Sequence, residues 1–393
     1  MRKGSLLALF LTVFIDLIGF GMVIPFLSYY AREYGASGIM VGAVVGVYSI
    51  MQFFFAPIWG RLSDRIGRRP VLLISLTASF TGYLMFGFTR TLLVLFLSRV
   101  IAGIGGANIG TAQAYISDVT SEEDRAKGMG LIGAAFGLGF ILGPPLSGIL
   151  ANFGTSRGLP GNLLPGIVAA GLSFTALLLA FSNLPESKPA DLQPRSGLPP
   201  QFDRRVWRYV ADHRVLGLLM AGLFLTLLAV AGMEMSVTLY ARDRFKFTQL
   251  DIAKLFLFMG AIVASIQGGL LGRLSRKFGE KTLIVVGAAS FTLGFALVPG
   301  ISRIPLLYGV GLFIGVGQGL CYPLLTSLVS KAAPEGERGS LLGLAASVGS
   351  LARFIGPILT GFLYDLAAAP GAFYGGAVLM LCALGIAVAV FRR

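Results

Sequence analysis

The stretch that decides the fold reads Gly60-Arg-Leu-Ser-Asp-Arg-Ile-Gly-Arg-Arg-Pro70. Its first eight residues return as Gly272-Arg-Leu-Ser-Arg-Lys-Phe-Gly279, an offset of 212 (272 − 60). Two further landmarks recur at an offset of 213: Gly143-Pro144 as Gly356-Pro357 (356 − 143), and Asp124-Arg125 as Glu337-Arg338 (337 − 124). Three landmarks at nearly one offset indicate a chain built by duplication from two related halves.

Long apolar stretches surround this repeat. A helix needs about 20 apolar residues to cross a hydrocarbon core of roughly 30 Å. Twelve such stretches are predicted, at residues 6–30, 38–59, 71–89, 92–117, 128–152, 162–184, 215–240, 250–272, 282–300, 304–330, 340–364 and 371–391. No stretch alternates as the strands of a membrane β-barrel do. The prediction is an all-α membrane protein with 12 transmembrane helices in two pseudo-symmetric six-helix bundles.

The composition excludes a water-soluble protein. Hydrophobic residues make up 55% of the 393 residues and charged residues 13%, against about 45–50% and about 25% in soluble domains. The net charge is +14. Most of the basic excess lies in the loops and termini expected in the cytoplasm, so it is an orientation signal and not a nucleic-acid footprint. The expected location is a plasma membrane, such as a bacterial inner membrane, with both termini inside.

A polar segment separates the two sets of six stretches. Residues 185–214 are rich in Pro and charge, which is typical of an exposed linker. A short amphipathic helix is expected around residues 202–213. The predicted domains are an N-terminal bundle at 1–184, a cytoplasmic linker at 185–214 and a C-terminal bundle at 215–393. One chain holds both bundles, so a monomer is expected.

The stretch that opens the repeat has the properties of a turn at the cytoplasmic face. Its glycines permit a tight turn, and Asp64 can cap a helix or pair with a cation. An anchor that only obeys the positive-inside rule is the alternative. The stretch resembles the signature between helices 2 and 3 of the major facilitator superfamily, almost residue for residue. That resemblance implies the major facilitator fold and a latch on the cytoplasmic side, with gating residues Gly60, Asp64, Arg65, Gly67, Arg68 and Arg69. The second copy has Arg276 in place of Asp64, so its latch is expected to be degenerate.

Two ionisable residues lie inside apolar stretches of the first half. Arg99 within hydrocarbon costs at least ~2.5–3.5 kcal/mol, so it should face the bundle interior and have a partner. Asp16 is the expected partner. It is the eleventh residue of the stretch 6–30, which places it about 15 Å deep at 1.5 Å per residue. A carboxylate there can take up and release a proton; a static pair that fastens two helices is the alternative.

The fifth stretch contains Gly137-Leu-Gly-Phe-Ile-Leu-Gly-Pro-Pro-Leu-Ser-Gly148. Small residues four apart make a smooth face, and the two prolines bend the helix. The run resembles the antiporter signature of the drug:proton antiporter family, which implies roles for Gly139, Gly143, Pro144 and Gly148. A helix-packing kink is the alternative, since small-residue faces are common packing devices in membranes.

The first stretch carries a further resemblance. Phe14-Ile-Asp-Leu-Ile-Gly-Phe-Gly-Met-Val-Ile-Pro25 is similar to the opening helix of tetracycline-type and quinolone-type efflux pumps, in which this acid takes part in proton coupling. The third and ninth stretches carry no acid, whereas tetracycline exporters have acids there. The resemblance therefore argues for a drug pump but against tetracycline itself as the substrate.

Glu234 is the other intramembrane acid, in the outer half of the seventh stretch. Met233 and Met235 flank it, and flexible methionines suit a promiscuous pocket. The pattern resembles quinolone-type exporters, where a glutamate serves protons or cationic drugs. A structural clasp between Glu234 and Arg353 is one alternative, and attraction of an anionic substrate by Arg353 is another. The expected cavity residues are Gln113, Asn108, Gln318, Arg353, Met233, Met235 and Tyr240; for each polar amide, an interhelical hydrogen bond is the alternative.

These features predict a proton-coupled antiporter that exports small amphipathic or drug-like molecules by alternating access, with Asp16, Glu234 and Arg99 in proton coupling. The alternative is an importer or exporter of the same fold that handles a metabolite, siderophore or lipid. A channel or a membrane-embedded enzyme fits less well, because the halves repeat and no nucleophile and base are clustered. The chain shows no ATP-binding or metal motif, so no cofactor or metal is expected. The expected partners are a small-molecule substrate, protons and the lipid bilayer.

Overall fold

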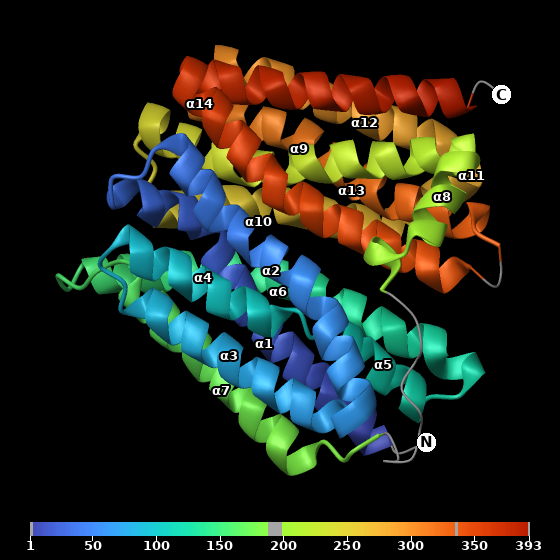
Figure 1. The fold of residues 1–393 in the computed structure, drawn as a ribbon. Helices are drawn as coiled ribbons and strands as arrows, with labels where there is room; N and C mark the ends of the chain where they lie inside the picture. The colour runs from blue at the N-terminus through green and yellow to red at the C-terminus, as the bar shows by residue number, and fades with distance from the viewer. Residues whose placement is uncertain (1–2, 188–198, 335–336, 392–393) are drawn as a thin grey trace. The chain divides into compact units, whose positions relative to one another are not determined.

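The computed structural model describes residues 3–187, 199–334 and 337–391, and all regular structure in these ranges is helical (Figure 1). Most of the predicted linker, residues 188–198, lies outside the described residues. The short helix predicted beyond it is confirmed as α8 (Arg204–Asp212), where the Asp203 side chain accepts a hydrogen bond from Arg205 N. A 3₁₀ turn at Pro200–Phe202 precedes it.

The helices of the first half follow the predicted stretches. They are α1 (Lys3–Glu33), α2 (Gly38–Ile66), α3 (Arg68–Gly87), α4 (Leu92–Gly106), α5 (Ile109–Val119), α6 (Glu122–Thr155) and α7 (Leu163–Asn183). Helices α4 and α5 together form the predicted fourth span, interrupted at Ala107 and Asn108.

The second half repeats this arrangement. Its helices are α9 (Arg214–Phe245), α10 (Gln249–Ser265), α11 (Leu271–Phe278), α12 (Glu280–Leu297), α13 (Ile304–Ala332) and α14 (Arg338–Phe391), with a π-helical segment at Ile266–Leu270 and a 3₁₀ turn at Val298–Gly300. Within the described ranges, 11 helical stretches are long and apolar enough to cross a membrane. The last of them, α14, holds two helices joined at Ala367 and Ala368, whose backbones are not helical. Each of the twelve predicted stretches thus has a helix.

The loop predicted at residues 60–70 is almost entirely helical. Helix α2 continues to Ile66 and α3 begins at Arg68, so Gly67 alone forms the turn, with φ +100°. The second copy has the same boundaries at the offset of the repeat, since α11 ends at Phe278 and α12 begins at Glu280. Its turn residue, Gly279, also has a positive φ of +79°. Only glycine adopts such a backbone freely, which explains its place in both copies.

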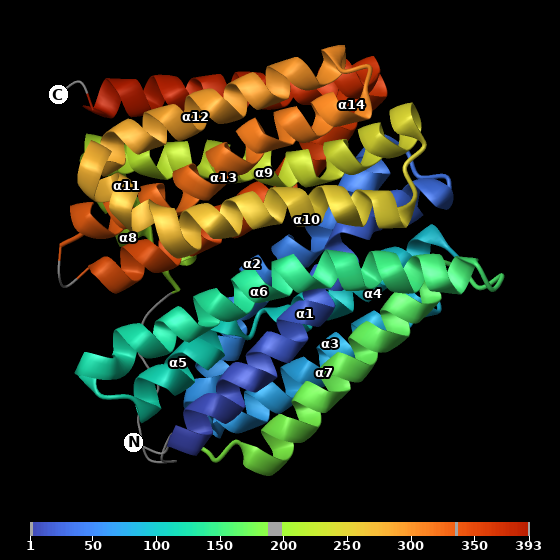
Figure 2. The same ribbon diagram turned by 180° about the vertical axis from the view of Figure 1, so that it is seen from behind.

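The chain forms two compact units, called here the first and the second unit. The first contains residues 1–35, 47–197 and 247–254, and the second contains 36–46, 198–246 and 255–393. Inside the first unit α1 packs against α6 and α7, and α3 packs against α4 and α7 (Figure 2). Inside the second unit α14 packs against α9 and α12, and α12 against α13. The core of the first unit therefore gathers around α1, the helix that carries Asp16.

Candidate functional site

Asp16 lies in the middle of α1 and is 9% exposed. Its Oδ1 accepts a hydrogen bond of 2.7 Å from the hydroxyl of Ser173 on α7. Tyr83 of α3 is an electrostatic neighbour of both Asp16 and Arg99. A buried carboxylate is costly in a membrane unless polar groups surround it. The first unit therefore supplies Asp16 with one neutral donor and one phenol.

Arg99 on α4 faces the interior of the first unit, as predicted, and is 1% exposed. Its Nε donates to Ser98 Oγ at 3.3 Å and its Nη2 to Gly82 O at 3.5 Å. The guanidinium also lies over the rings of Tyr83 and Phe86, 5.8 and 5.5 Å from their centroids. Two aromatic faces can stabilise a desolvated cation.

The predicted direct pair between Asp16 and Arg99 is not formed among the described residues. Asp16 takes its hydrogen bond from Ser173, and Arg99 takes a carbonyl and two rings. Burial of both charges was expected from their cost in hydrocarbon. The partners differ because the depth of a residue in the membrane does not define the direction in which its helix faces. Tyr83 stands as the common neighbour of the two charges.

The glycines of the predicted antiporter motif bring α6 against α1. A Cβ on Gly139 would lie 2.7 Å from the carbonyl oxygen of Leu17, and one on Gly143 would lie 2.6 Å from Met22 N. Both values are too short for real Cβ atoms. Two helix backbones are therefore in direct contact, beginning at the residue next to Asp16. Pro144 lies inside α6, one residue beyond this contact.

Gly148 does not share this contact. A Cβ there would meet Ala253 of α10, which belongs to the first unit. The glycines of the motif thus pack α6 against two different helices, α1 and α10. This geometry agrees with the alternative that the motif serves helix packing. A role in antiport stays a prediction.

Glu234 and Arg353 are neighbours in the second unit. Both are half-buried, on α9 and α14, and they interact electrostatically. Arg353 Nη2 also donates to Ser350 Oγ at 3.2 Å. This geometry fits a structural clasp between Glu234 and Arg353. It also fits a coupling role, because a cation then lies beside an acid whose charge can change.

The other predicted cavity residues of α9 are packed inside the second unit. Met233 and Met235 are each 1% exposed, because successive side chains on a helix point about 100° apart and cannot all face the side of Glu234. The hydroxyl of Tyr240 lies 3.1 Å from Val298 O and 2.9 Å from Ile301 O, so it fastens α9 to the turn after α12. These three side chains are packed among helices in this structure, and a role for them in the cavity stays a prediction.

The polar amides divide between packing and exposure. Asn108 is buried, and its Nδ2 donates to Ser75 Oγ at 3.0 Å, which is the interhelical alternative. Gln113 is exposed and Gln318 is half-buried. At the break between α4 and α5, Gly106 O accepts from Gln52 Nε2 at 3.0 Å. Side chains from α2 and α3 thus satisfy polar groups around an interrupted helix, a feature typical of transporter binding regions.

Among the predicted gating residues, Arg68 has the most interactions. It is buried, and its guanidinium pairs with Asp64 at 2.8 Å and with Asp118 at 3.1 Å. Arg65 is exposed and Gly60 faces open space. Asp118, at the end of α5, was missed by sequence reasoning because it precedes a run of charges that reads as a loop.

Glu186 was also missed, because it begins the charged linker. Its Oε1 accepts from Arg68 N at 2.8 Å and its Oε2 from Arg69 N at 3.1 Å. A carboxylate at this place satisfies the free N–H groups of a helix start and its partial positive charge. Arg69 Nη2 donates to Phe181 O at 2.6 Å. The turn at Gly67 is therefore closed within the first unit by the end of α7 and by Glu186, which follows it.

The second copy of the turn retains an ion pair with its charges reversed. By the offsets of the repeat, Glu280 corresponds to Arg68 (280 − 68 = 212) and Lys331 to Asp118 (331 − 118 = 213). Lys331 Nζ lies 2.8 Å from Glu280 Oε2. Arg276, in the place of Asp64, donates from Nε to Gly272 O at 3.3 Å on its own helix. The second copy of the turn has lost the aspartate, as the sequence shows, but it has kept an ion pair at the start of α12.

The comparisons with known proteins agree with this architecture. Residues 9–357 and 261–393 match the Major Facilitator Superfamily. The chain belongs to this superfamily. The "Tetracycline resistance protein, class C" of Escherichia coli is 31% identical over 390 residues, covering 97% of this chain and 96% of the relative. The prediction of the family is confirmed, and the chain is a multi-pass membrane protein and secondary transporter, not an enzyme.

Two solved structures are similar to this major facilitator. The crystal structure of the human organic anion transporter MFSD10 (TETRAN) is 25% identical with a TM-score of 0.70, covering 98% of this chain and 99% of that one. The nucleoside transporter NupG is 16% identical with a TM-score of 0.73, covering 100% of both chains, which shows the fold alone. The predicted fold class is confirmed.

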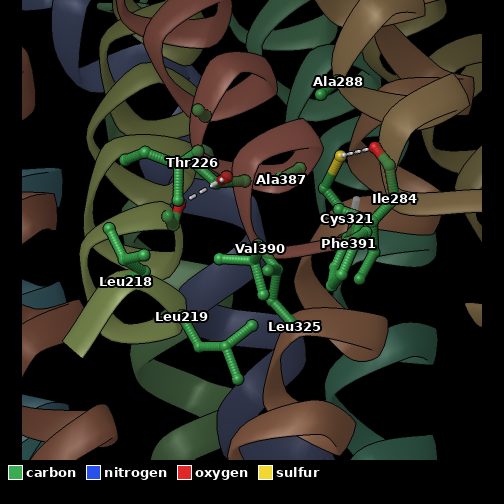
Figure 3. A pocket seen from close by; sticks show the side chains of 13 residues that line it. Leu218, Leu219, Thr226, Ile284, Ala288, Cys321, Leu325, Ala387, Val390 and Phe391 are labelled. Atoms are coloured by element: carbon green, nitrogen blue, oxygen red, sulfur yellow. Dashed lines mark hydrogen bonds between the residues drawn. The ribbon is translucent and has the colours of Figure 1, made fainter. Parts of the chain in front are cut away.

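Figure 3 shows a small apolar pocket of this major facilitator, lined by α9, α12, α13 and α14 of the second unit. Its volume of about 10 Å³ is enough for roughly one water molecule. The polar groups of its lining are bonded to backbone: Thr226 Oγ1 donates to Gly222 O at 2.8 Å, and Cys321 Sγ lies 3.9 Å from Ile284 O. None of the predicted site residues lines it, so it is not the expected drug cavity.

Replacing Gly67 with Ala is expected to destabilise the turn of this transporter. The φ of +100° strains any residue with a Cβ, and that Cβ would overlap the carboxylate of Glu186. Such strain costs of order 1–3 kcal/mol. Thermal unfolding in detergent measures the effect, with Gly60→Ala as the control, because Gly60 is helical and open space surrounds it. Equal melting temperatures for the two variants would contradict the conclusion that the turn requires glycine at position 67.

Proposed function

We propose that this major facilitator is a proton-coupled antiporter that exports small amphipathic or drug-like molecules by alternating access. The observation that carries the proposal is a carboxylate inside a spanning helix in each unit, Asp16 in the middle of α1 and Glu234 in the outer half of α9. Ionisable groups in a membrane are costly and are kept mainly for function. The family relationship to a protein named for tetracycline resistance supports export. The excess of basic residues in the loops supports an orientation with both termini in the cytoplasm, and the similarity to a bacterial protein favours a bacterial inner membrane.

Exchange follows from the chemistry of the carboxylates. Protonation removes the charge of Asp16 or of Glu234 and so changes which conformation is favoured. A substrate and a proton that stabilise different conformations drive each other across the membrane in opposite directions. Arg353 keeps Glu234 beside a cation in the second unit. In the first unit, Asp16 and Arg99 share Tyr83 as an electrostatic neighbour.

Organic anion transport is the second candidate. A half-buried cation, Arg353, lies beside Glu234, and an anionic substrate could replace the glutamate as its partner. One of the similar solved structures is that of a human organic anion transporter. An importer or exporter of a metabolite, siderophore or lipid would use the same exchange chemistry.

A proteoliposome assay tests the proposal. The purified chain is reconstituted, a proton gradient is imposed, and flux is followed for a cationic dye, a neutral amphipathic drug and an organic anion. Gradient-driven movement of the dye or drug, opposite to the proton, is expected. If none of the three probes moves in response to the gradient, or if each moves equally without it, the proposal is wrong.

Two matched variants in the same assay separate the two candidates. Glu234→Gln removes the acid with little change in volume, and Arg353→Gln removes the cation but keeps a polar side chain. For an exporter of cations, Glu234→Gln is expected to lower cation flux by about tenfold or more, the equivalent of ~1.4 kcal/mol. For an anion transporter, Arg353→Gln is expected to lower anion flux by that amount. A loss of both fluxes in both variants would show that the pair only fastens α9 to α14.

A further inference from the structure

We propose that Ser173 is the positioning residue of the coupling carboxylate, and that its hydrogen bond transmits the protonation state of Asp16 from α1 to α7. The proposal rests on the proposed function, because it assumes that Asp16 binds the coupled proton. Ser173 is 0% exposed, and its hydroxyl donates to Asp16 Oδ1 at 2.7 Å. That distance is normal for an O–H···O hydrogen bond and also fits a charge-assisted one.

The bond depends on a close approach of three helices. A Cβ on Gly19 of α1 would lie 3.3 Å from Ala169 O of α7 and 3.3 Å from a ring carbon of Tyr83 on α3. Gly19 is about one turn from Asp16, and Ala169 is about one turn from Ser173. Residues three or four apart lie on one face of a helix. The same faces therefore supply the packing contact and the hydrogen bond.

The surroundings leave Ser173 a distinct role. Among the described residues, its hydroxyl is the one side-chain group that hydrogen-bonds Asp16. Tyr83 of α3 interacts electrostatically with the carboxylate of Asp16. Arg99 of α4 and Tyr48 of α2 interact electrostatically with Tyr83 in turn. From α6, the neighbouring contact is the glycine backbone at Gly139. The serine is therefore the group through which a neighbouring helix is bonded to the carboxylate.

The chemistry of the bond explains how α7 responds to the proton. The ionised carboxylate only accepts, so the serine must donate to it. Once Asp16 is protonated, both groups are neutral and the bond loses its charge assistance, which accounts for about half of its strength. The link between α1 and α7 is therefore stronger without the proton and weaker with it. Proton binding loosens one packed helix pair in the first unit.

The pH profile of gradient-driven flux in proteoliposomes tests this role. Ser173→Ala is expected to move the midpoint of the profile by about one pH unit toward higher pH, because the ionised form alone loses a strong donor. Ser173→Thr keeps the hydroxyl and is expected to restore the wild-type midpoint. Thr12→Val is the matched control: Thr12 is buried on α1, one turn from Asp16, and its hydroxyl bonds to Ala8 O on its own helix.

The outcomes separate this proposal from the proposed function. An unchanged midpoint in Ser173→Ala, or the same shift in Thr12→Val, overturns the role of Ser173 even if Asp16→Asn abolishes proton coupling. If Asp16→Asn leaves coupling intact, the assignment of Asp16 fails and the role of Ser173 fails with it. Equal thermal stability of the Ser173 variants in detergent shows that a shifted midpoint reports on the bond and not on unfolding.

Discussion

Replacing Asp16 with Asn is expected to abolish proton-driven transport while leaving the protein folded. The amide has the shape of the carboxyl group, and its oxygen can still accept the hydrogen bond from Ser173, but it cannot bind a coupled proton. Gradient-driven flux is expected to fall by about 100-fold or more, equivalent to ~2.7 kcal/mol. Exchange of substrate across a membrane without a proton gradient is expected to continue, which separates lost coupling from lost binding.

Asp251→Asn is the control for this prediction. Asp251 is an acid at the start of α10 and is paired with Lys254 at 3.3 Å, with side chains that are 38% and 58% exposed. Exposed pairs of this kind contribute little, so this variant is expected to transport at the wild-type rate. Full gradient-driven flux in Asp16→Asn would show that the proton is carried elsewhere, and Glu234 would then be the next residue to test.

Replacing Gly143 with Ala is expected to cause a large loss of stability for the addition of a single methyl group. The new Cβ would meet the backbone of Gly21 and Met22 on α1, and a backbone cannot turn away as a side chain can. Helix α6 must then move away from α1, along the same helix contact that brings Gly139 against Leu17, the residue next to Asp16. Overpacking of this kind costs about 1–3 kcal/mol, and transport is expected to fall with it. Thermal unfolding and flux measure the two effects.

Gly137→Ala on the same helix gives the opposite expectation. No atom lies within 4 Å of a Cβ at Gly137, and Ala is favoured over Gly inside a helix by about 1 kcal/mol. The control is therefore expected to be as stable as wild type or more so. If both alanines changed stability in the same direction, the close contact between α1 and α6 would be wrong.

The sequence was sufficient for the architecture because hydrocarbon imposes a simple rule. About 20 apolar residues mark each crossing, and the repeat at 60–70 and 272–279 marked the duplication. Hydropathy does not locate the ends of the helices, because a helix can continue with its backbone hydrogen bonds into polar residues beyond the hydrocarbon. For that reason the expected loop at 60–66 proved to be helix, with the turn confined to Gly67.

The candidate site was only partly predictable for a different reason. Burial of Asp16 and Arg99 follows from the cost of charge in a membrane, and it was found. Their partners depend on how each helix is rotated, which no local pattern encodes. Ser173 was overlooked because serine is common in membrane helices and carries no charge. Tyr83 was overlooked because an aromatic in an apolar stretch reads as packing.

The reversed ion pairs of the two halves limit how the gene can change. If the segment that starts α3 were copied over the segment that starts α12, Arg68 would be set beside Lys331. The reciprocal copy would set Glu280 beside Asp118. Either exchange places like charges together, so recombination between the duplicated segments is penalised unless the partner helix moves as well. A designer who wishes to rebuild this protein from two identical halves must first choose one polarity for both.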